Sequence, residues 1–461
     1  MHLEQFFLSC LAHASYFVDS EGEAVVIDPQ RDIEQYLSAA RERGATIKYV
    51  IETHLHADFV SGHRELAERT GAQIYLGAKA DARFAHVPVR DGDELRFGAC
   101  KLSFYETPGH TLESVSIVLT DETRSPEPYA VFTGDTLFIG DVGRPDLGGE
   151  PRELAGMLFD SLHGKLLRLP DDVLVYPAHG AGSLCGRAMS EDRSSTIGRE
   201  RTTNYALQVA GKAAFVDLMT EDLPDRPAYF ASDVEMNRSG AAMLSDFREL
   251  SALDPQEVIA LQQRGALVID VRDEYAFGSA HVPASVNIGL DGQFASWAGQ
   301  VVGLDVDVIL LGENVTSVEE ARMRLSRVGI DRTIGYVRDG IPGWRAAGLP
   351  VATLPQIEPD GFAERVRSGL QTIDVRRDPE WSTGHLAGAV HLPLHRLLAA
   401  VDDLDRERAV GVYCKSGYRS AIAGSLLQRS GFKDVVNLAG GIDAWSSAGL
   451  QTSQVSTPPP R

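Results

Sequence analysis

The chain has 461 residues, which is too long for one ordinary hydrophobic core and predicts two to four domains. A hydrophobic content of 43% and a charged content of 24% are typical of a globular protein. Its 44 basic and 65 acidic residues give a net charge of −21, which argues against a general nucleic-acid or anionic-membrane surface. No apolar run approaches a membrane span and no secretory signal is evident, so we expect a cytoplasmic location, with the four scattered cysteines as free thiols.

The first 235 residues alternate strand-like runs with helix-like stretches and are expected to form one domain. Within residues 32–43, for example, Ile33, Leu37 and Ala40 fall on one helical face, which suits a helix laid on a sheet. A proline-punctuated segment then leads into residues 236–253, which we interpret as a linker.

Three polar side chains follow strand-like runs in this domain. His54 comes after the apolar run 47–51, His110 lies in Thr-Pro-Gly-His-Thr, and Asp135 lies in Thr-Gly-Asp-Thr. Two imidazoles and one carboxylate can hold one iron ion and leave positions open for a substrate and dioxygen. We therefore predict a metal site formed by His54, His110 and Asp135.

These segments resemble the metallo-β-lactamase superfamily, and more narrowly its persulfide dioxygenase branch, which implies an αββα sandwich. Binuclear relatives of the glyoxalase II type have a histidine where this chain has Phe59. A phenyl ring offers no lone pair, so we expect a single Fe(II) per chain. Arg144 and His179 lie in segments that also resemble this branch and are predicted substrate contacts. His56 and Asp58, and His179 as the alternative to a substrate contact, are expected to support the ligands or to remain from a second metal site.

Cys10 lies in an early strand-like segment that, in the fold implied by the resemblance, leads past the metal pocket. A functional thiol, as sulfur acceptor or substrate contact, and a packed core position are both open for it. Because similar fusion proteins have a cysteine at this place, we keep Cys10 as a candidate catalytic residue. Cys100 and Cys185 have weaker claims.

The region after the linker contains an internal repeat. Residues 268–273 recur at 372–377, and residues 281–288 recur at 385–392 with the same offset. Each copy alternates strand-like and helix-like stretches, which predicts a small parallel α/β domain. The whole chain is therefore expected to be a multidomain α/β protein.

Both copies resemble rhodanese, the sulfurtransferase domain, over residues 254–352 and 355–452. A short proline-rich tail, residues 453–461, is expected to be disordered. In the rhodanese family a cysteine begins a loop that runs into a helix. The first copy has no thiol in the corresponding stretch, and a covalent persulfide needs a nucleophile, so we interpret it as a degenerate structural or docking domain.

The second copy has the loop Cys-Lys-Ser-Gly-Tyr-Arg-Ser, which begins at Cys414. A loop that enters a helix N-terminus points several backbone N–H groups at one atom, and Lys415 and Arg419 add positive charge. We therefore expect a reactive thiolate at Cys414 and predict it as the catalytic cysteine. Lys415, Gly417 and Arg419 are the predicted contacts of the bound sulfur anion.

The resemblance implies a non-heme iron persulfide dioxygenase fused to a thiosulfate sulfurtransferase, acting in sulfide oxidation. A low-molecular-weight thiol persulfide and dioxygen are the expected substrates, and sulfite is the expected product. Cys414 would pass sulfur to make or use thiosulfate. Two alternatives remain, a glyoxalase II-like metallohydrolase fused to rhodanese, against which Phe59 argues, and a sulfur-sensing scaffold. The thiol that carries the persulfide and the oligomeric state, a homo-oligomer included, stay open.

Overall fold

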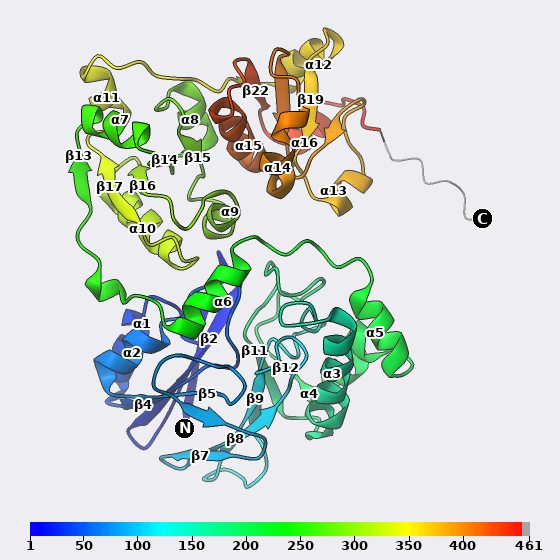
Figure 1. Ribbon diagram of the computed structural model, residues 1–461. Coiled ribbons are helices and arrows are strands. Elements are labelled where there is room, and N and C mark those ends of the chain that lie inside the picture. The colour runs from blue at the N-terminus through cyan, green and yellow to red at the C-terminus, as the bar shows by residue number, and fades with distance from the viewer. Residues whose placement is uncertain (454–461) are drawn as a thin grey trace. The chain divides into compact units, whose positions relative to one another are not determined.

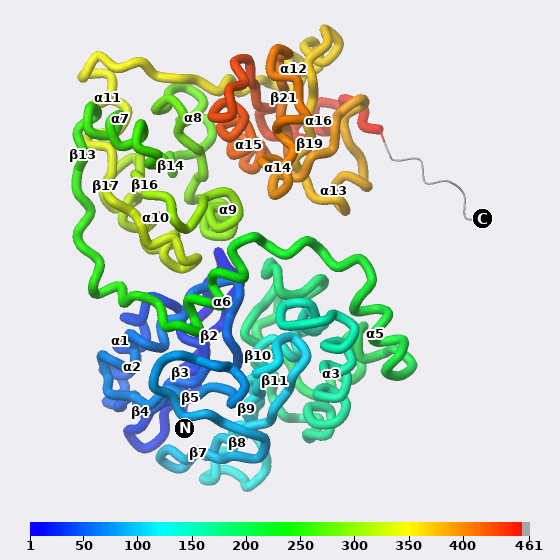
Figure 2. The backbone as a smooth tube through the Cα atoms, viewed as in Figure 1, coloured from blue at the N-terminus to red at the C-terminus, as the bar shows by residue number. Residues whose placement is uncertain are grey.

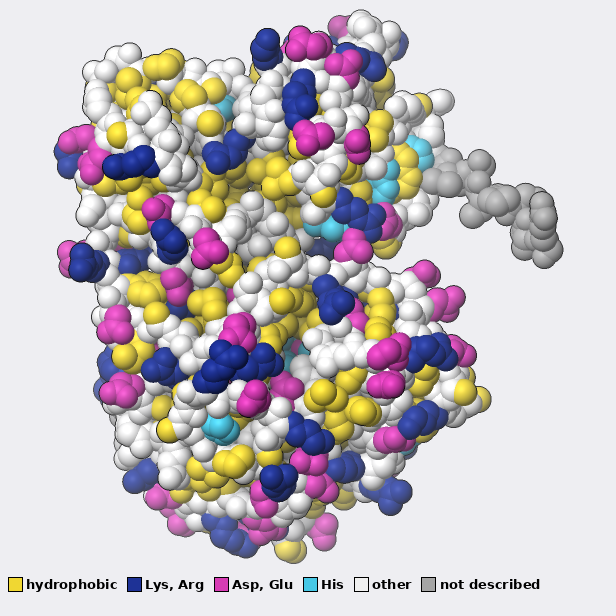
Figure 3. Space-filling view, in the orientation of Figure 1, with side chains coloured by type: hydrophobic (Ala, Val, Ile, Leu, Met, Phe, Trp, Pro, Cys, Tyr) yellow, Lys and Arg dark blue, Asp and Glu magenta, His cyan; other side chains and the backbone are white. Residues whose placement is uncertain are grey.

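A computed structural model of the chain describes residues 1–453. These residues form two compact units, the first made of Met1–Arg248 with the short segment Ser326–Gly329, and the second beginning at Glu249 (Figures 1 and 2). None of the helices described is both long and apolar enough to cross a membrane. On the face drawn in Figure 3, basic side chains are interspersed with acidic ones.

The first unit contains two six-stranded sheets. The first sheet keeps its strands in chain order, antiparallel at its beginning and parallel from the third strand onward. Its strands are β1 (His2–Leu8), β2 (His13–Ser20), β3 (Glu23–Ile27), β4 (Thr46–Ile51), β5 (Gln73–Gly77) and β6 (Val87–Val89). The second sheet has the order β12-β11-β10-β9-β8-β7. Its strands are β7 (Glu94–Phe97), β8 (Cys100–Glu106), β9 (Val115–Asp121), β10 (Ala130–Gly134), β11 (Leu174–Pro177) and β12 (Ser195–Thr196).

Helices cover the outer face of each sheet, which gives the αββα sandwich (Figure 1). The helices are α1 (Glu34–Arg43), α2 (His63–Thr70), α3 (Pro151–Gly164), α4 (Ile197–Thr203), α5 (Lys212–Thr220) and α6 (Phe230–Ser239). Val25 and Phe132 belong to the core between the sheets, whereas Tyr36 of α1 packs with the outward-facing Val26. Successive strand residues point to opposite faces, so β3 contributes to both cores.

The end of the first unit differs from the expected linker. Residues 236–239 belong to α6. The side chain of Asn237 in this helix is buried and donates hydrogen bonds to the carbonyl oxygens of His56 and Phe59, each at 2.8 Å. Its Oδ1 accepts from the N–H of Ser61 at 2.8 Å. These bonds tie α6 to the loop that follows β4.

The second unit contains two five-stranded parallel sheets with the same strand order. The first is β13-β17-β16-β14-β15 and the second is β18-β22-β21-β19-β20, so each strand has a counterpart in the other copy. The first set is β13 (Ser251–Leu253), β14 (Leu267–Asp270), β15 (Val286–Asn287), β16 (Val308–Leu311) and β17 (Thr333–Val337). The second set is β18 (Gln356–Ile357), β19 (Gln371–Asp374), β20 (Val390–His391), β21 (Val410–Tyr413) and β22 (Val435–Leu438).

Helices surround these sheets, and β14, β16, β21 and β22 are therefore buried along their whole length, as parallel strands usually are. The first copy has α7 (Pro255–Gln263), α8 (Glu274–Ser279), α9 (Phe294–Val301), α10 (Val315–Ser326) and α11 (Gly340–Ala346). The second has α12 (Pro359–Arg367), α13 (Asp378–Ser382), α14 (Leu397–Ala400), α15 (Tyr418–Arg429) and α16 (Gly441–Ser447). Ser453 pairs with His385, and the tail expected to be disordered lies from residue 454 onward outside the described residues.

Candidate metal centre and cysteine loop

Three ligand-type side chains meet where strands of both sheets end. His54 follows β4, Asp135 follows β10, and His110 lies in the loop between β8 and β9. Nε2 of His110 lies 3.4 Å from Oδ2 of Asp135, and Nε2 of His54 lies 3.8 Å from the same oxygen. All three side chains are buried. The structure thus brings together the residues that the sequence predicts as metal ligands.

A hydrogen bond at Nδ1 orients each imidazole. Oγ1 of Thr53 donates to Asp28 at 2.9 Å and lies 3.0 Å from Nδ1 of His54, so it accepts from that ring. The carbonyl oxygen of Arg144 accepts from Nδ1 of His110 at 3.0 Å. Because Nδ1 carries the proton in both rings, each Nε2 keeps its lone pair for a metal ion. Nε2 of His110 is buried without a hydrogen-bond partner in the described part of the chain.

Burial and neighbouring charge favour the protonation states that a metal requires. Burial lowers the pKa values of His54 and His110, so both imidazoles are neutral near pH 7. Burial acts to raise the pKa of Asp135, but the charge and hydrogen bond of His179, together with His54 and His110, outweigh it and hold this pKa well below its usual range. Two neutral imidazoles and one carboxylate fit a divalent metal ion, iron among them.

His179 lies between two carboxylates beside the three ligands. It follows β11, which runs parallel to β10, so His179 and Asp135 leave neighbouring strands at one sheet edge. Its Nδ1 lies 2.8 Å from Asp135, and its Nε2 lies 2.9 Å from Asp58. Burial acts to lower the pKa of His179, but the two carboxylates raise it to about 10. His179 therefore orients Asp135 as a cation, with a carboxylate beside each ring nitrogen, and its contact with substrate stays a prediction.

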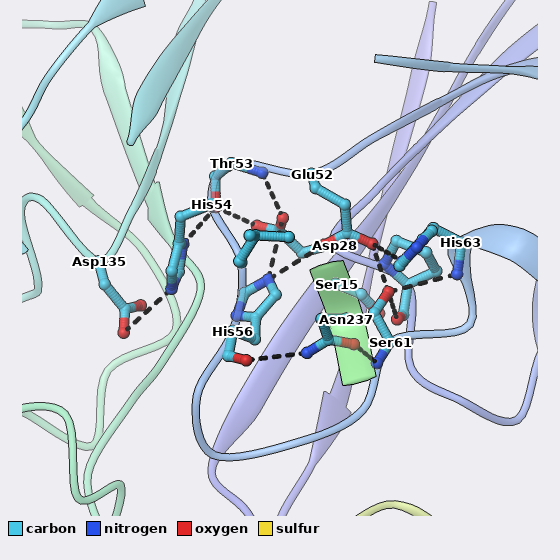
Figure 4. A network of polar contacts seen from close by, with 12 residues as sticks. Ser15, Asp28, Glu52, Thr53, His54, His56, Ser61, His63, Asp135 and Asn237 are labelled. Atoms are coloured by element: carbon cyan, nitrogen blue, oxygen red, sulfur yellow. Dashed lines mark hydrogen bonds and ion pairs between the residues drawn. The ribbon is translucent and has the colours of Figure 1, made fainter. Parts of the chain in front are cut away.

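His56 belongs to a polar network on the strand ends of the first sheet that continues through Asp28 and Thr53 to His54 (Figure 4). Its Nε2 lies 3.2 Å from Asp28 and 3.3 Å from Glu52. Glu52 also lies 3.2 Å from Nδ1 of His63 and accepts a hydrogen bond from the hydroxyl of Ser61. Burial acts to lower the pKa of His56, but Asp28 and Glu52 raise it well above its usual value. His56 therefore ties the loop that carries His54 to the strand ends of the first sheet, and with Asp58 and His179 it forms a second buried group of ligand-type side chains.

Arg144 is held by protein groups on both sides of its side chain, and its role as a substrate contact stays a prediction. Its guanidinium forms a bidentate ion pair with Asp146, at 2.7 and 2.9 Å, and donates to the carbonyl oxygens of Leu184 and Pro224. Its backbone N–H donates to the carbonyl oxygen of Cys185 at 3.1 Å. Arg144 therefore connects the His110 ring to the loop at 184–185, and its charged group is fully engaged there.

Cys10 lies in a turn and not in the strand that the sequence suggests. The N–H of Ala12 bonds the carbonyl oxygen of Ser9 at 3.3 Å, because residues 9–12 reverse the chain between the antiparallel β1 and β2. Cys10 is partly exposed, and within residues 1–453 it joins none of the clusters of metal-ligand side chains.

Cys414 begins the loop between β21 and α15. The N–H of Gly417 donates to its Sγ at 3.1 Å, and the hydroxyl of Ser420 donates to the same sulfur at 3.4 Å. Gly417 has a φ of +107°, a conformation that favours glycine and lets the chain enter α15. From α16, the N–H of Ile442 holds the carbonyl oxygen of Cys414 at 2.9 Å.

The two cations predicted around this loop lie in different surroundings, and their contact with a bound sulfur anion stays a prediction. Arg419 forms a bidentate ion pair with Glu380 of α13, at 2.6 and 2.7 Å, so its guanidinium is part of the loop wall. Lys415 is exposed. The donors that reach the sulfur are therefore Gly417 and Ser420.

Comparison with known proteins accounts for both units. The Metallo-beta-lactamase superfamily model matches residues 8–179, and the Rhodanese-like domain model matches residues 254–347 and 358–448. The human mitochondrial persulfide dioxygenase ETHE1 is 34% identical over 199 residues, which are 43% of this chain and 71% of that protein. The chain belongs to the metallo-β-lactamase superfamily. Two rhodanese-like domains follow its metallo-β-lactamase domain.

Other relatives of the metallo-β-lactamase domain have a different name. A hydroxyacylglutathione hydrolase from Polaromonas sp. is 39% identical over 161 residues, which are 34% of this chain and 57% of that protein. The chain thus spans little more than half the length of that hydrolase. A crystal structure of a metallo-beta-lactamase from Staphylococcus aureus subsp. aureus COL is 33% identical, with a TM-score of 0.67, and covers 73% of this chain and 98% of its own.

The metallo-β-lactamase domain contains two further side chains at the site, one for which the sequence supports only a weak claim and one that sequence reasoning missed. Cys185 is buried, and its Sγ, a carboxylate oxygen of Asp135 and a ring nitrogen of His179 lie within 4.8 Å of one another. The only signal in the sequence is its position six residues after His179, in the same loop.

His13, the first residue of β2, is the second such side chain. Its ring centroid lies 4.0 Å from that of Phe59 and 5.4 Å from that of His179. Both ring nitrogens are buried without a hydrogen-bond partner among the described residues. Phe59 and His13 thus lie beside His179, and His13 has hydrogen-bonding capacity there that no described residue uses.

Proposed function

We propose that the chain is a non-heme iron persulfide dioxygenase fused to a thiosulfate sulfurtransferase. The observation that carries the proposal is the ligand set, in which Nε2 of His54 and Nε2 of His110 converge on Asp135. One Fe(II) per chain would be held by these three residues. Iron supplies the redox chemistry that activates dioxygen toward sulfur, which protein side chains do not supply.

The surrounding residues keep the ligand set in one protonation state and one orientation. Thr53 and the carbonyl oxygen of Arg144 fix the tautomers of the two imidazoles, and His179 holds the Asp135 carboxylate. In the proposed reaction one persulfide, one dioxygen and one water give one thiol, one sulfite and two protons. The two sulfur atoms together lose four electrons, and dioxygen gains them.

Sulfur transfer is assigned to Cys414. Its thiolate would attack the outer sulfur of a persulfide or of thiosulfate, so that one S–S bond forms on the enzyme while the donor's S–S bond breaks. Sulfite would then accept this sulfur and leave as thiosulfate, or a thiol would accept it as a persulfide. The donors of Gly417 and Ser420 support this assignment because they would stabilise negative charge on the sulfur.

A hydrolase remains the second candidate because hydroxyacylglutathione hydrolases are among the relatives. Phe59 favours the dioxygenase, because a phenyl ring offers no lone pair at a position where binuclear hydrolases have a histidine ligand.

The iron content of the protein and the oxygen uptake of the His110→Ala variant test the proposal. Anaerobically purified protein should contain close to one iron per chain by elemental analysis and consume oxygen when persulfide is added. His110→Ala should lose the iron and at least about a hundredfold in oxygen uptake, because no other side chain can replace this ligand. Thiosulfate:thiol sulfur transfer should persist in that variant.

His2→Ala serves as the matched control, because His2 is a half-exposed histidine outside the site. It should match the unmodified protein in iron content and in both activities. Two tightly bound zinc ions with thioester hydrolysis and no oxygen uptake would refute the dioxygenase and favour the hydrolase.

A further inference from the structure

The helix that follows Cys414 contacts the rhodanese-like domain that lacks a cysteine. The hydroxyl of Tyr418 donates to the carbonyl oxygen of Gly289 at 2.8 Å, and Oγ of Ser425 accepts from the N–H of Asn287 at 3.1 Å. Tyr418 and Ser425 are seven residues apart, so they lie on one face of α15. This face of α15 therefore packs on β15 and on the segment that follows it.

Two glycines of the first rhodanese-like domain make room for the Tyr418 ring. A Cβ atom at Gly292 would overlap that ring, and a Cβ atom at Gly289 would lie 3.4 Å from it. In the register that aligns His281 with His385, these glycines correspond to Pro393 and Arg396 of the second copy. The second copy therefore has larger residues where the first copy has the two glycines that leave room for the Tyr418 ring.

The position of α15 determines the geometry around Cys414. Tyr418 is the first residue of this helix and directly follows Gly417, whose N–H donates to the Cys414 sulfur. Ser420, the other donor to that sulfur, lies in the same helical turn. A displacement of the Tyr418 ring would therefore move both donors, because they share its short stretch of backbone.

We propose that the first rhodanese-like domain positions the Cys414 loop through Tyr418, which it holds at Gly289 and Gly292. Tyr418 is then a positioning residue, and the domain without a cysteine is required for sulfur transfer in the other. This inference rests on the proposed sulfur transfer at Cys414. It also gives a positioning role to the first copy, whose own loop at Gly312–Ser317 contains no thiol.

The decisive variant is Gly292→Ala, because it changes a domain that has no chemistry of its own. We expect a roughly fivefold fall in kcat for thiosulfate:thiol transfer, the scale of one lost hydrogen bond, with KM for thiosulfate nearly unchanged. Tyr418→Phe keeps the ring and should lose less activity than Tyr418→Ala. Combining Tyr418→Ala with Gly292→Ala should give no further loss, since the small side chain removes the overlap.

A second readout separates this inference from the proposed function. The rate at which iodoacetamide alkylates Cys414, followed by peptide mass spectrometry, depends on the loop and not on any physiological substrate. It should change by a similar factor in Gly292→Ala and in Tyr418→Phe, even if the natural sulfur donor is another compound. Oxygen uptake should stay unchanged in both.

Gly303→Ala and Tyr275→Phe are the matched controls, because Gly303 has only Val306 near it and Tyr275 is exposed. Both controls should match the unmodified protein. Unchanged alkylation and unchanged transfer in a folded Gly292→Ala protein would overturn the inference. Strictly additive losses in the double variant would also overturn it, because independent effects would mean that the ring and the glycine do not act together.

Discussion

A thiol lies inside the polar cluster of the metallo-β-lactamase domain. Two backbone hydrogen bonds hold Cys185 there. Its N–H donates to Oγ of Ser183 in the same loop at 3.1 Å, and its carbonyl oxygen accepts from the N–H of Arg144 in another loop. Its sulfur lies among the ligand-type atoms of Asp135 and His179. A polarizable sulfur at this place suits a substrate whose reacting atom is also sulfur. We therefore expect Cys185 to contact the bound persulfide.

Cys185→Ser tests this contact, because serine keeps the size and the hydrogen-bonding capacity but removes the soft sulfur. The variant should retain its iron and lose about tenfold in kcat/KM for oxygen uptake on persulfide, the effect of ~1.4 kcal/mol of transition-state stabilisation. Stopped-flow or electrode measurements of oxygen consumption give this ratio.

Cys100→Ser is the matched control, because Cys100 is equally buried but lies in the β7–β8 hairpin, outside the clusters of ligand-type side chains found within residues 1–453. Equal kcat/KM values in the two variants would refute a role for Cys185. A loss of iron in Cys185→Ser alone would make this residue a support of the metal site instead of a substrate contact.

The end of β10 is shaped to receive the end of β4. Gly134 has a φ of +52°, and a Cβ atom there would lie 2.6 Å from Oγ1 of Thr53. Thr53 in turn bonds the His54 ring and the Asp28 carboxylate. Gly134 therefore brings the first and second sheets close enough for His54 and Asp135 to share one ion.

Gly134→Ala should lower the iron content well below that of the unmodified protein, because the added methyl group displaces Thr53 and with it the His54 ring. The left-handed φ alone should cost about 1 kcal/mol or more of folding free energy. Gly71→Ala gives the matched comparison, since Gly71 has a φ of +74° but no atom within 4 Å of its Cβ position.

Elemental analysis and thermal unfolding distinguish the two effects. Both variants should unfold at a lower temperature, and only Gly134→Ala should lose iron. Normal iron content in Gly134→Ala would contradict the assigned role of this close contact.

The sequence predicts the three ligands because each follows a strand-like run and because the three segments together resemble the metallo-β-lactamase superfamily in residue type and order. It does not predict Cys185, because long-range hydrogen bonds place the loop that carries it. The carboxylate of Asp141 accepts from the backbone N–H groups of Arg187 and Ala188 at 2.5 and 2.7 Å, across more than forty residues of chain. The engagement of Arg144 by Asp146 is likewise a matter of side-chain geometry, which no local pattern indicates.

The repeat predicts the two parallel sheets of the second unit, and the structure confirms rhodanese-like domains with identical strand order. The contact of α15 with the first copy was not predictable. It depends on Gly289 and Gly292 lying beside Tyr418, and neither glycine differs in the sequence from an ordinary loop residue. Domain identity follows from repeated patterns, whereas a domain's task depends on contacts between residues far apart in the chain.

We propose that persulfide, sulfite and thiosulfate carry sulfur between the two units. The products formed by Cys414→Ser test whether the Cys414 loop is part of this path. Serine stays protonated near neutral pH and cannot carry a persulfide, so sulfur transfer should fall to background. Oxygen uptake should continue, because the metal ligands lie in the other unit. The product should shift from thiosulfate toward sulfite, since the sulfur that would join sulfite has no carrier.

Thiol derivatisation and chromatography of the products check this expectation, with Cys100→Ser as the buried-cysteine control. Cys10→Ser should resemble Cys414→Ser only if Cys10 also carries sulfur, and its partly exposed position in a turn leaves it accessible for that role. Unchanged thiosulfate formation by Cys414→Ser would mean that the sulfur reaches sulfite without the rhodanese loop. In that case the fused domains would not form one sulfur path, although each could still have its own activity.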